Sequence, residues 1–193
     1  MKGAYPVKKM LEFRWHGRGG QGAWTASELL ARTAIAEGKY IQSFPEFGPE
    51  RMGAPVTAFT RISTEPLRIH CAVYDPDVVV VLDNTLLKTV PVTAGLNRDE
   101  DVIIINSAEK PAVIRENLRI QKGAVWTVAA TEIALKILGA PITNTALLGV
   151  VAKSTNIVTM DGIEKTVKER FKGDLAEKNM AVIRMAYEEA KSE

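Results

Sequence analysis

The sequence contains a single cysteine, Cys71, and only two histidines, His16 and His70, among its 193 residues. One thiol cannot form an internal disulfide, and an iron–sulfur cluster held by one chain usually takes about four thiolates. Two histidines are too few for a typical zinc site without other ligands. We therefore expect no metal site on this chain, so any metal centre that works with it should belong to another subunit.

A strong net charge and long apolar runs are missing as well. The formal net charge is +2, with 25 lysines and arginines against 23 acids, so the phosphate affinity of a nucleic-acid binder is not expected. No apolar run reaches the length of a membrane span, and residues 1–10 lack a secretory hydrophobic segment. These absences predict a cytoplasmic protein that binds neither nucleic acid nor a membrane.

What is present is the composition of an ordinary globular protein, with 46% hydrophobic and 25% charged residues. We expect one domain over residues 1–193. Continuous β-branched runs at 77–83 and 102–106 are typical of strands buried on both faces of a parallel sheet. The other predicted strands are 11–16, 39–44, 55–62, 67–73 and 124–129. Of these, 67–73 would form a hairpin with 55–62.

Helical patterns lie between these strands and dominate the end of the chain. The predicted helices are 23–37, 85–90, 91–96, 112–117, 130–138, 144–155 capped by Asn144, one opened by a capping box of Asp161 and Glu164, and a last one through 175–187. Strands that alternate with helices argue for βαβ units. The predicted fold is thus α/β: a three-layer α/β/α, Rossmann-like domain with a mostly parallel sheet and a helical C-terminal part.

Residues 13–23 form the most informative segment, because they read as a strand, a tight glycine turn and a helix start. The turn consists of Gly17, Arg18, Gly19, Gly20, Gln21 and Gly22. Glycine lets the backbone take positive φ, which we expect at Gly19, and lie close to another body. The following helix points unpaired N–H groups at the turn. Such a place suits an anion, a phosphate ester or a polar loop of a partner protein.

The same glycines match the dinucleotide template Gly-x-Gly-x-x-Gly at Gly17, Gly19 and Gly22. The acid expected about 20 residues further on in the NAD version is absent: Gln42 stands there, and Glu46 lies beyond Pro45. A free-standing Rossmann-type nucleotide-binding oxidoreductase is therefore an alternative interpretation. A second alternative is a structural turn that binds nothing and only lets the strand and helix pack closely.

The segment between Pro45 and Pro55 is an irregular loop rich in proline and glycine. It carries Phe47, Arg51 and Met52, which we expect to be exposed. Loops on a rigid scaffold are where binding residues collect. A rigid connector and a binding loop are equally compatible with this composition.

Three stretches together resemble one family: residues 14–22, 43–55 and 76–83. They are similar to the gamma subunit of 2-oxoacid:ferredoxin oxidoreductases, in the pyruvate (pyruvate synthase) and 2-ketoisovalerate branch. Residues 144–149 look like a further family segment, and the resemblance runs from about residue 11 to the C-terminal helix. The combination is far more specific than the glycine turn alone.

The resemblance implies a role inside a larger enzyme. That enzyme decarboxylates a 2-oxoacid on thiamine diphosphate and magnesium, passes two electrons through iron–sulfur clusters to ferredoxin, and transfers the acyl group to coenzyme A. A thiamine diphosphate site needs a Gly-Asp-Gly segment, which this sequence lacks. We therefore expect a subunit with no catalytic residue and no cofactor of its own, bound to alpha-, beta- and delta-type subunits and serving ferredoxin through the complex.

Two regions are the candidate contact sites. The glycine turn, from Gly17 to Gly22, would bind a cofactor or dock a partner; Arg18 would suit coenzyme A phosphates, but we favour docking. The predicted docking loop contributes Ser43, Glu46, Phe47, Glu50 and Arg51, and both regions are expected on one edge of the sheet, facing partner subunits. His16 could donate a proton near neutral pH, although we favour a purely local hydrogen-bonding role.

Overall fold

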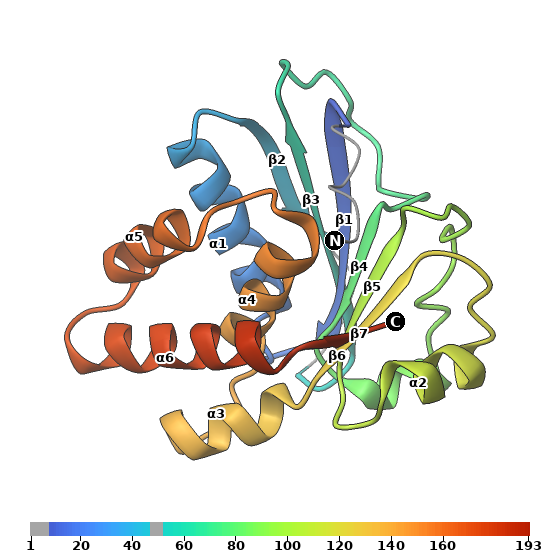
Figure 1. The fold of residues 1–193 in the computed structure, drawn as a ribbon. Coiled ribbons are helices and arrows are strands. Elements are labelled where there is room, and N and C mark those ends of the chain that lie inside the picture. The colour runs from blue at the N-terminus through green and yellow to red at the C-terminus, as the bar shows by residue number, and fades with distance from the viewer. Residues whose placement is uncertain (1–7, 47–51) are drawn as a thin grey trace.

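The computed structural model describes residues 8–46 and 52–193, which form a sheet of seven strands flanked by helices (Figure 1). The strand order is β2-β3-β1-β4-β5-β6-β7. The strands are β1 (Met10–Arg18), β2 (Tyr40–Pro45), β3 (Pro55–Ser63), β4 (Val78–Val81), β5 (Val102–Asn106), β6 (Ala124–Val128) and β7 (Lys191–Ser192). Strands β1, β4, β5 and β6 pair in parallel, whereas β3 and β7 pair antiparallel with their neighbours.

Helices cover both faces of this sheet, as Figure 1 shows. One face carries α1 (Ala23–Ala36), α3 (Ala130–Leu138), α4 (Asn144–Thr155), α5 (Met160–Arg170) and α6 (Asp174–Glu189). The other carries the 3₁₀ helix η1 (Asn84–Lys88) and α2 (Pro111–Leu118). The predicted three-layer α/β/α fold with a helical C-terminal part is confirmed, and the sheet is mixed at both edges.

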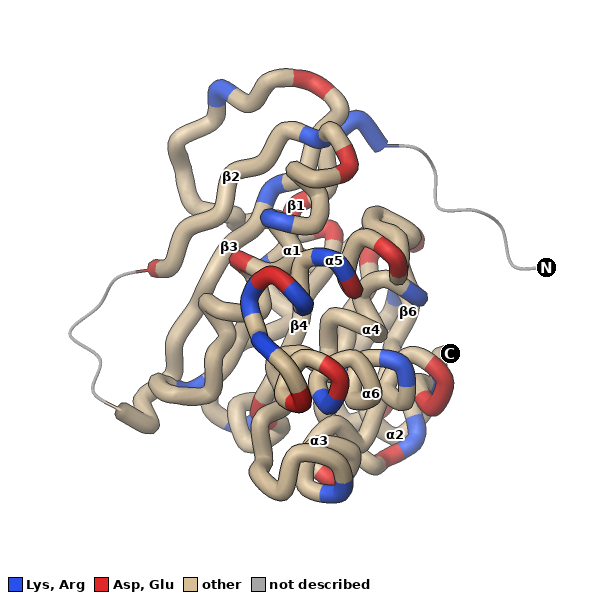
Figure 2. The backbone as a smooth tube through the Cα atoms, turned by 90° about the vertical axis from the view of Figure 1, so that its left-hand side faces the viewer, with Lys and Arg blue, Asp and Glu red and all other residues tan. Residues whose placement is uncertain are grey.

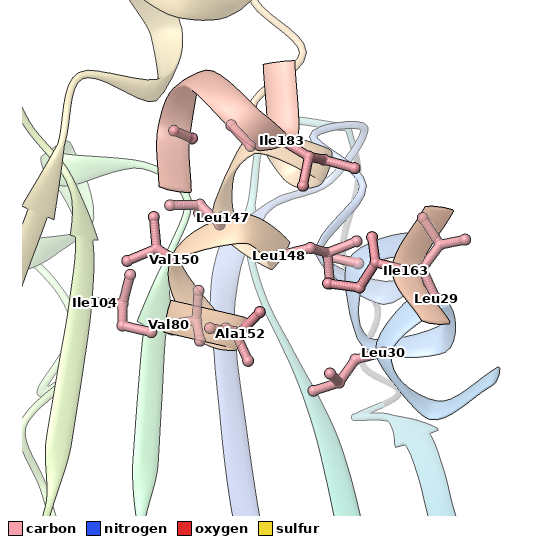
Figure 3. Close-up of a cluster of buried hydrophobic side chains, with 14 of the residues drawn as sticks. Leu29, Leu30, Val80, Ile104, Leu147, Leu148, Val150, Ala152, Ile163 and Ile183 are labelled. Carbon is pink, nitrogen blue, oxygen red and sulfur yellow. The ribbon is translucent and has the colours of Figure 1, made fainter. Parts of the chain in front are cut away.

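The β-branched run of β4 explains why the sheet is covered on both sides. Val78 and Val80 face the larger helical layer, while Val79 and Val81 face η1 and α2, and all four are fully buried. Burial of both faces is what a continuous apolar run in a parallel strand predicts. Figure 3 shows Val80 of β4 and Ile104 of β5 directed at Val150 of α4.

Helix α4 lies at the centre of the larger layer, between the sheet, α1 and α6 (Figure 3). Leu147 and Leu148 are buried on this helix, and Leu148 lies near Ile163 of α5 and Leu29 of α1. Gly149 allows the closest approach, since a Cβ on it would collide with the carbonyl oxygen of Ile183 in α6. The family segment 144–149 is therefore buried in the core of this layer.

The predicted strand at 67–73 is wrong, because these residues have no strand pairing and follow an irregular path. Arg61 of β3, 1% exposed, reaches across to this segment. Its guanidinium donates to the carbonyls of Cys71 at 2.8 Å and Ala72 at 3.1 Å, and to the Glu12 carboxylate at 2.7 Å. A side chain of the expected hairpin partner, rather than its backbone, thus binds these carbonyls.

Several helix ends also differ from the sequence predictions. Residues 91–96 form turns rather than a helix, and of the helix predicted at 85–90 only residues 85–88 belong to the 3₁₀ helix η1. Thr159, rather than Asp161, caps α5 by accepting from the Gly162 N–H at 3.0 Å. Thr143 stands at the N-cap of α4, so that Asn144 is the first helical residue. The short edge strand β7 had no pattern long enough to predict it.

Replacing Gly149 with Ala tests the close packing of α4 against α6. We expect the free energy of unfolding to fall by about 2 kcal/mol, because overpacking against a fixed carbonyl outweighs the ~1 kcal/mol gain in helix propensity. Chemical denaturation of the full chain measures this. Lys136→Ala, at an exposed position of α3, is the control and should leave stability unchanged. A Gly149→Ala variant as stable as the parent would show that the two helices separate at little cost.

Candidate functional site

The glycine turn joins the end of β1 to the start of α1, as the sequence predicted. The positive φ values lie at Gly20 (92°) and Gly22 (79°) among the described glycines of this turn, and not at Gly19 as expected. Gly17 brings strand and helix together, since a Cβ there would lie 3.1 Å from the Ala23 Cβ. The turn therefore both packs β1 tightly on α1 and opens the helix N-terminus to the surface.

Arg18, the candidate for phosphate contact, is held by groups of the protein itself. Its Nε donates to the Asp83 Oδ2 at 3.1 Å, Nη2 to the Thr85 Oγ1 at 2.8 Å and Nη1 to the Gly53 carbonyl at 3.1 Å. The side chain is partly buried in this arrangement. Recruiting Arg18 to a phosphate would require breaking these contacts, so its position favours a structural role in shaping the turn.

Asp83, directly after β4, is the acceptor at the centre of this network. Besides Arg18, it accepts from the Gln21 Nε2 at 2.7 Å and from the Thr85 N–H and hydroxyl at 2.9 and 2.6 Å. Burial would raise the pKa of Asp83, but the bonds from Thr85 and Gln21 and the charge of Arg18 outweigh it and lower the pKa. Asp83 thus remains ionised and locks the turn to the end of β4.

The turn is also joined to the end of the predicted docking loop. The Gly19 N–H donates to the Ala54 carbonyl at 2.8 Å, and the Gly53 N–H donates back to the Gly19 carbonyl at 3.0 Å. Met52, 91% exposed, lies over Gly20. The turn and residues 52–54 therefore form one hydrogen-bonded unit with an apolar side chain at its surface.

Of the residues that were predicted to form the docking loop, the described ones are not part of this hydrogen-bonded unit. Ser43 is half-buried in β2, with its Oγ 3.2 Å from the Ser27 Oγ of α1. Glu46 is exposed, and its N–H donates to the Thr57 carbonyl at 2.9 Å. Phe47, Glu50 and Arg51 lie outside the described residues.

His16 is buried near the end of β1, on the sheet face opposite α1. Its Nε2 accepts from the Arg14 Nε at 3.1 Å, while Arg14 Nη2 donates to the Val92 and Ala94 carbonyls at 3.1 and 2.5 Å. Burial, together with the charge of Arg14, lowers the pKa of His16 to about 4. The local hydrogen-bonding role that we favoured is confirmed, and His16 is neutral at pH 7.

An open cavity of about 790 Å³ lies beside the glycine turn, at the carboxyl ends of β1, β4, β5 and β6. In open parallel sheets this edge is the usual place for ligands. The sequence reasoning identified the contribution of the turn, Gly20 to Gly22, but missed the residues that follow the other three strands. These are Leu82, Asp83, Asn84, Asn106, Ser107, Ala108, Ala129, Thr131 and Glu132. Their position just after each predicted parallel strand was the signal that could have identified them.

Three helix N-termini meet at this cavity. Helices α1, α3 and α4 begin at its wall, and in the described chain none of their N-cap residues, Gly22, Ala129 and Thr143, makes a side-chain capping bond. The Asn106 side chain partly substitutes at α3, where Oδ1 accepts from the Thr131 N–H at 3.2 Å. The cavity is thus rich in hydrogen-bond donors that carry only partial charge.

Formal charge in the cavity is negative rather than positive. Asp83 and Glu132 are the charged side chains among its described lining residues, which include no lysine or arginine. Over the described chain, lysines and arginines alternate with acids without forming a basic face (Figure 2). Within residues 8–46 and 52–193 we find no group of three or more histidine, cysteine, aspartate or glutamate side chains suited to a metal ion, and no helix long and apolar enough to cross a membrane.

Fold and geometry together define a Rossmann-like α/β protein with an open cavity at the carboxyl edge of its sheet, beside a glycine turn held by Asp83. The chain belongs to the pyruvate ferredoxin/flavodoxin oxidoreductase family, which it matches over residues 12–189. The family resemblance read from the three sequence stretches is confirmed.

Individual relatives show which branch of the family the chain resembles. The chain is 55% identical to the "Pyruvate/ketoisovalerate oxidoreductases common subunit gamma" of Pyrococcus furiosus, over 93% of this chain and 96% of that protein. It is 50% identical to "Pyruvate synthase subunit PorC" of Methanothermobacter marburgensis, over 94% of this chain and 98% of that protein. The crystal structure of pyruvate oxidoreductase subunit PORC from Thermotoga maritima superposes with a TM-score of 0.86 at 40% identity, covering 96% of this chain and 99% of that one. These relatives do not favour the alternative of a free-standing nucleotide-binding oxidoreductase.

The buried His16 predicts a pH-dependent stability. Because its folded pKa is about 4 and its ordinary value is 6.5, the unfolded chain binds more protons between these pH values, so stability falls as the pH drops. We expect His16→Gln to reduce the loss between pH 7 and pH 4.5 by about 2–3 kcal/mol, measured by urea unfolding at both pH values. His70→Gln, at an exposed histidine, should retain the parent's slope. Equal slopes in the parent and the His16 variant would contradict a neutral buried His16.

Proposed function

We propose that this chain is the gamma subunit of a multi-subunit 2-oxoacid:ferredoxin oxidoreductase, with pyruvate as the leading substrate. The complex would convert 2-oxoacid, coenzyme A and oxidised ferredoxin to acyl-CoA, carbon dioxide and reduced ferredoxin. The relatives named gamma subunit or PorC, which match nearly the whole length of the chain, are the observation that carries this proposal.

The chain's own residues support a role without a resident cofactor. Cys71 is the only cysteine, and it lies in the segment held by Arg61, whereas a cluster usually takes about four thiolates. The residues therefore do not fit an iron–sulfur cluster. The missing Gly-Asp-Gly segment likewise argues against thiamine diphosphate and magnesium here. In this proposal these groups belong to the alpha-, beta- and delta-type subunits, and ferredoxin is reached through them.

We assign docking against the thiamine-bearing subunits to the surface around the glycine turn. The turn is preorganised by the Asp83 network and by its bonds to residues 53–54. A surface that is already ordered loses little conformational entropy on binding. Trp24 at the start of α1 and Met52 beside Gly20 add exposed apolar area. Large side chains of this kind often dominate interface energetics.

Contact between the glycine turn and coenzyme A is the second candidate. The uncapped N-terminus of α1 favours it, because such termini attract phosphate groups. Two observations weigh against it: Arg18 is engaged by Asp83, and the cavity beside the turn carries two carboxylates but no cation among its described lining residues. We therefore rank partner docking first. We also propose that residues 1–193 act as one domain and that the complex is cytoplasmic, on the sequence reasoning given above.

Purification of the native complex tests the function as a whole. We expect this chain to co-purify with a thiamine-bearing and a cluster-bearing chain. Ligand binding separates the alternatives, since saturating binding shifts the melting temperature through mass action. A shift of the isolated chain with NAD(P)H but not with coenzyme A would support the free-standing oxidoreductase, and purification without any partner would contradict the subunit role.

Trp24→Ala tests the docking surface. Because Trp24 is 40% exposed at the end of α1 nearest the turn, its loss should cost little stability but weaken binding to the partner subunits at least tenfold. The apparent Kd for assembly of the complex measures this. Ile35→Ala is the matched control, since Ile35 is 54% exposed at the other end of the same helix and should have no effect on assembly. If both variants assemble like the parent, the docking surface lies elsewhere.

A further inference from the structure

Asn144 and Thr143 present polar groups to the cavity that no atom of the described chain satisfies. Asn144 is 8% exposed; its Oδ1 accepts from the Thr145 N–H at 2.8 Å, but its Nδ2 has no acceptor in the described residues. Thr143 is 6% exposed, and its hydroxyl likewise makes no side-chain bond there. Every fully sealed side-chain nitrogen and oxygen among the described residues has a partner, so these two groups are not sealed off. Both residues line the cavity, and Asn144 also lines a smaller neighbouring one of about 280 Å³.

The position of Asn144 links the family segment of α4 to the glycine turn. A Cβ on Gly22 would collide with the Asn144 Nδ2, so the amide lies directly against the backbone of the turn. The free amide donor, the uncapped N-terminus of α1 and the turn thus point into the same space. A glycine at position 22 is required both for its positive φ and for this contact.

The electrostatics of the cavity select the chemistry of an occupant. Donors that carry only partial charge favour an oxygen acceptor, but Glu132, which makes no ion pair in the described residues, opposes a full negative charge, whereas Asp83 is already paired with Arg18. The positive ends of three helices oppose a cation in turn. A neutral acceptor, such as a peptide carbonyl, satisfies both conditions.

The shape of the cavity favours an extended occupant. Its lining residues follow β1, β4, β5 and β6 in turn, so it crosses the ends of four adjacent strands. Neighbouring strands lie about 4.8 Å apart, which gives a length of ~14 Å. An extended chain covers roughly 3.4 Å per residue, so about four residues would span it.

We propose that this cavity receives an extended, uncharged segment of about four residues from a partner subunit of the oxidoreductase, and that Asn144 Nδ2 donates to one of its carbonyl oxygens. The inference rests on the proposed function and names the chemistry of the partner at that surface. Thr143 supplies a second hydrogen bond from the same helix start. The family segment at 144–149 would then serve two purposes, core packing at Gly149 and recognition at Asn144.

Asn144→Asp in the assembled complex is the decisive variant. The aspartate keeps the acceptor for the Thr145 N–H and adds charge at a helix N-terminus, where it is tolerated, so the fold should be retained. It replaces the free donor with a carboxylate that repels a carbonyl oxygen. We expect the apparent Kd for assembly, followed by dilution and native mass spectrometry, to rise at least tenfold. Asn97→Asp, an exposed asparagine before β5, makes the same charge change at the opposite sheet edge and should leave it unchanged.

A photo-reactive amino acid in place of Ile142, which is exposed at the cavity wall, identifies the occupant directly. The proposal expects cross-links to one short segment of a single partner subunit. Unchanged assembly by Asn144→Asp, or cross-links to no partner, would overturn it. Tighter assembly would indicate a cationic occupant. Normal assembly with a raised KM for coenzyme A would indicate a small-molecule occupant. Either result would exclude the proposed segment. A parent chain that never assembles would instead refute the proposed function itself.

Discussion

The hydrogen-bonded ion pair between Asp83 and Arg18 is the constraint on which the shape of the glycine turn depends. Asp83 lies two residues after the end of β4, Arg18 is the last residue of β1, and the two strands are parallel neighbours, so their carboxyl ends meet at one edge. Through Gln21 and Gly53 the same network orders the glycine turn and the returning loop. Because the groups are only partly buried, the carboxylate stays charged while water screens it incompletely. Without this anchor, four glycines in six residues would leave the turn free to sample many conformations.

A second set of buried charges shapes the opposite side of the sheet. Arg14 and Arg61 project from β1 and β3, where helices would cover a standard Rossmann-like sheet. Arg14 donates mainly to backbone carbonyls of irregular segments, and Arg61 donates to the carbonyls of Cys71 and Ala72 as well as to side chains. Removing such a guanidinium would leave several carbonyls without partners, which costs more than a single exposed hydrogen bond. The sheet therefore has one half packed by apolar side chains and another covered by loops that arginines hold. This asymmetry leaves His16 buried beside Arg14 and uncharged.

The predictable part of the fold depended on local patterns. The β-branched runs, the stripe of α1 and the glycine turn follow rules that involve neighbours in sequence, and each lies where it was expected. The failures at 67–73 and 91–96 have a different cause, since arginine side chains bind carbonyls of both segments: Arg61 of β3, the expected hairpin partner, at 67–73, and Arg14 of β1 at 91–96. The site divides in the same way. Gly20 to Gly22 could be identified from the turn, whereas Asn106, Ser107 and Thr143 become neighbours only when four strands align. No pattern within a short stretch of sequence predicts how these strands align.

The proposed docking role gives a physical reason for the backbone conformation and the helix starts at this sheet edge. Gly20 and Gly22 hold positive φ, and the N-cap residues of three helices around one cavity make no side-chain capping bond, although Asn106 and Asn144 each accept from one N–H at the starts of α3 and α4. Capping each start with Ser, Asp or Asn would stabilise an isolated chain by ~1 kcal/mol per helix. In the proposed docking role, donors left free at these helix starts would be satisfied by another molecule, while the Asp83–Arg18 ion pair holds the surrounding backbone. The densely packed layer around α4, where Gly149 and its neighbours are buried, anchors the same helices away from this edge.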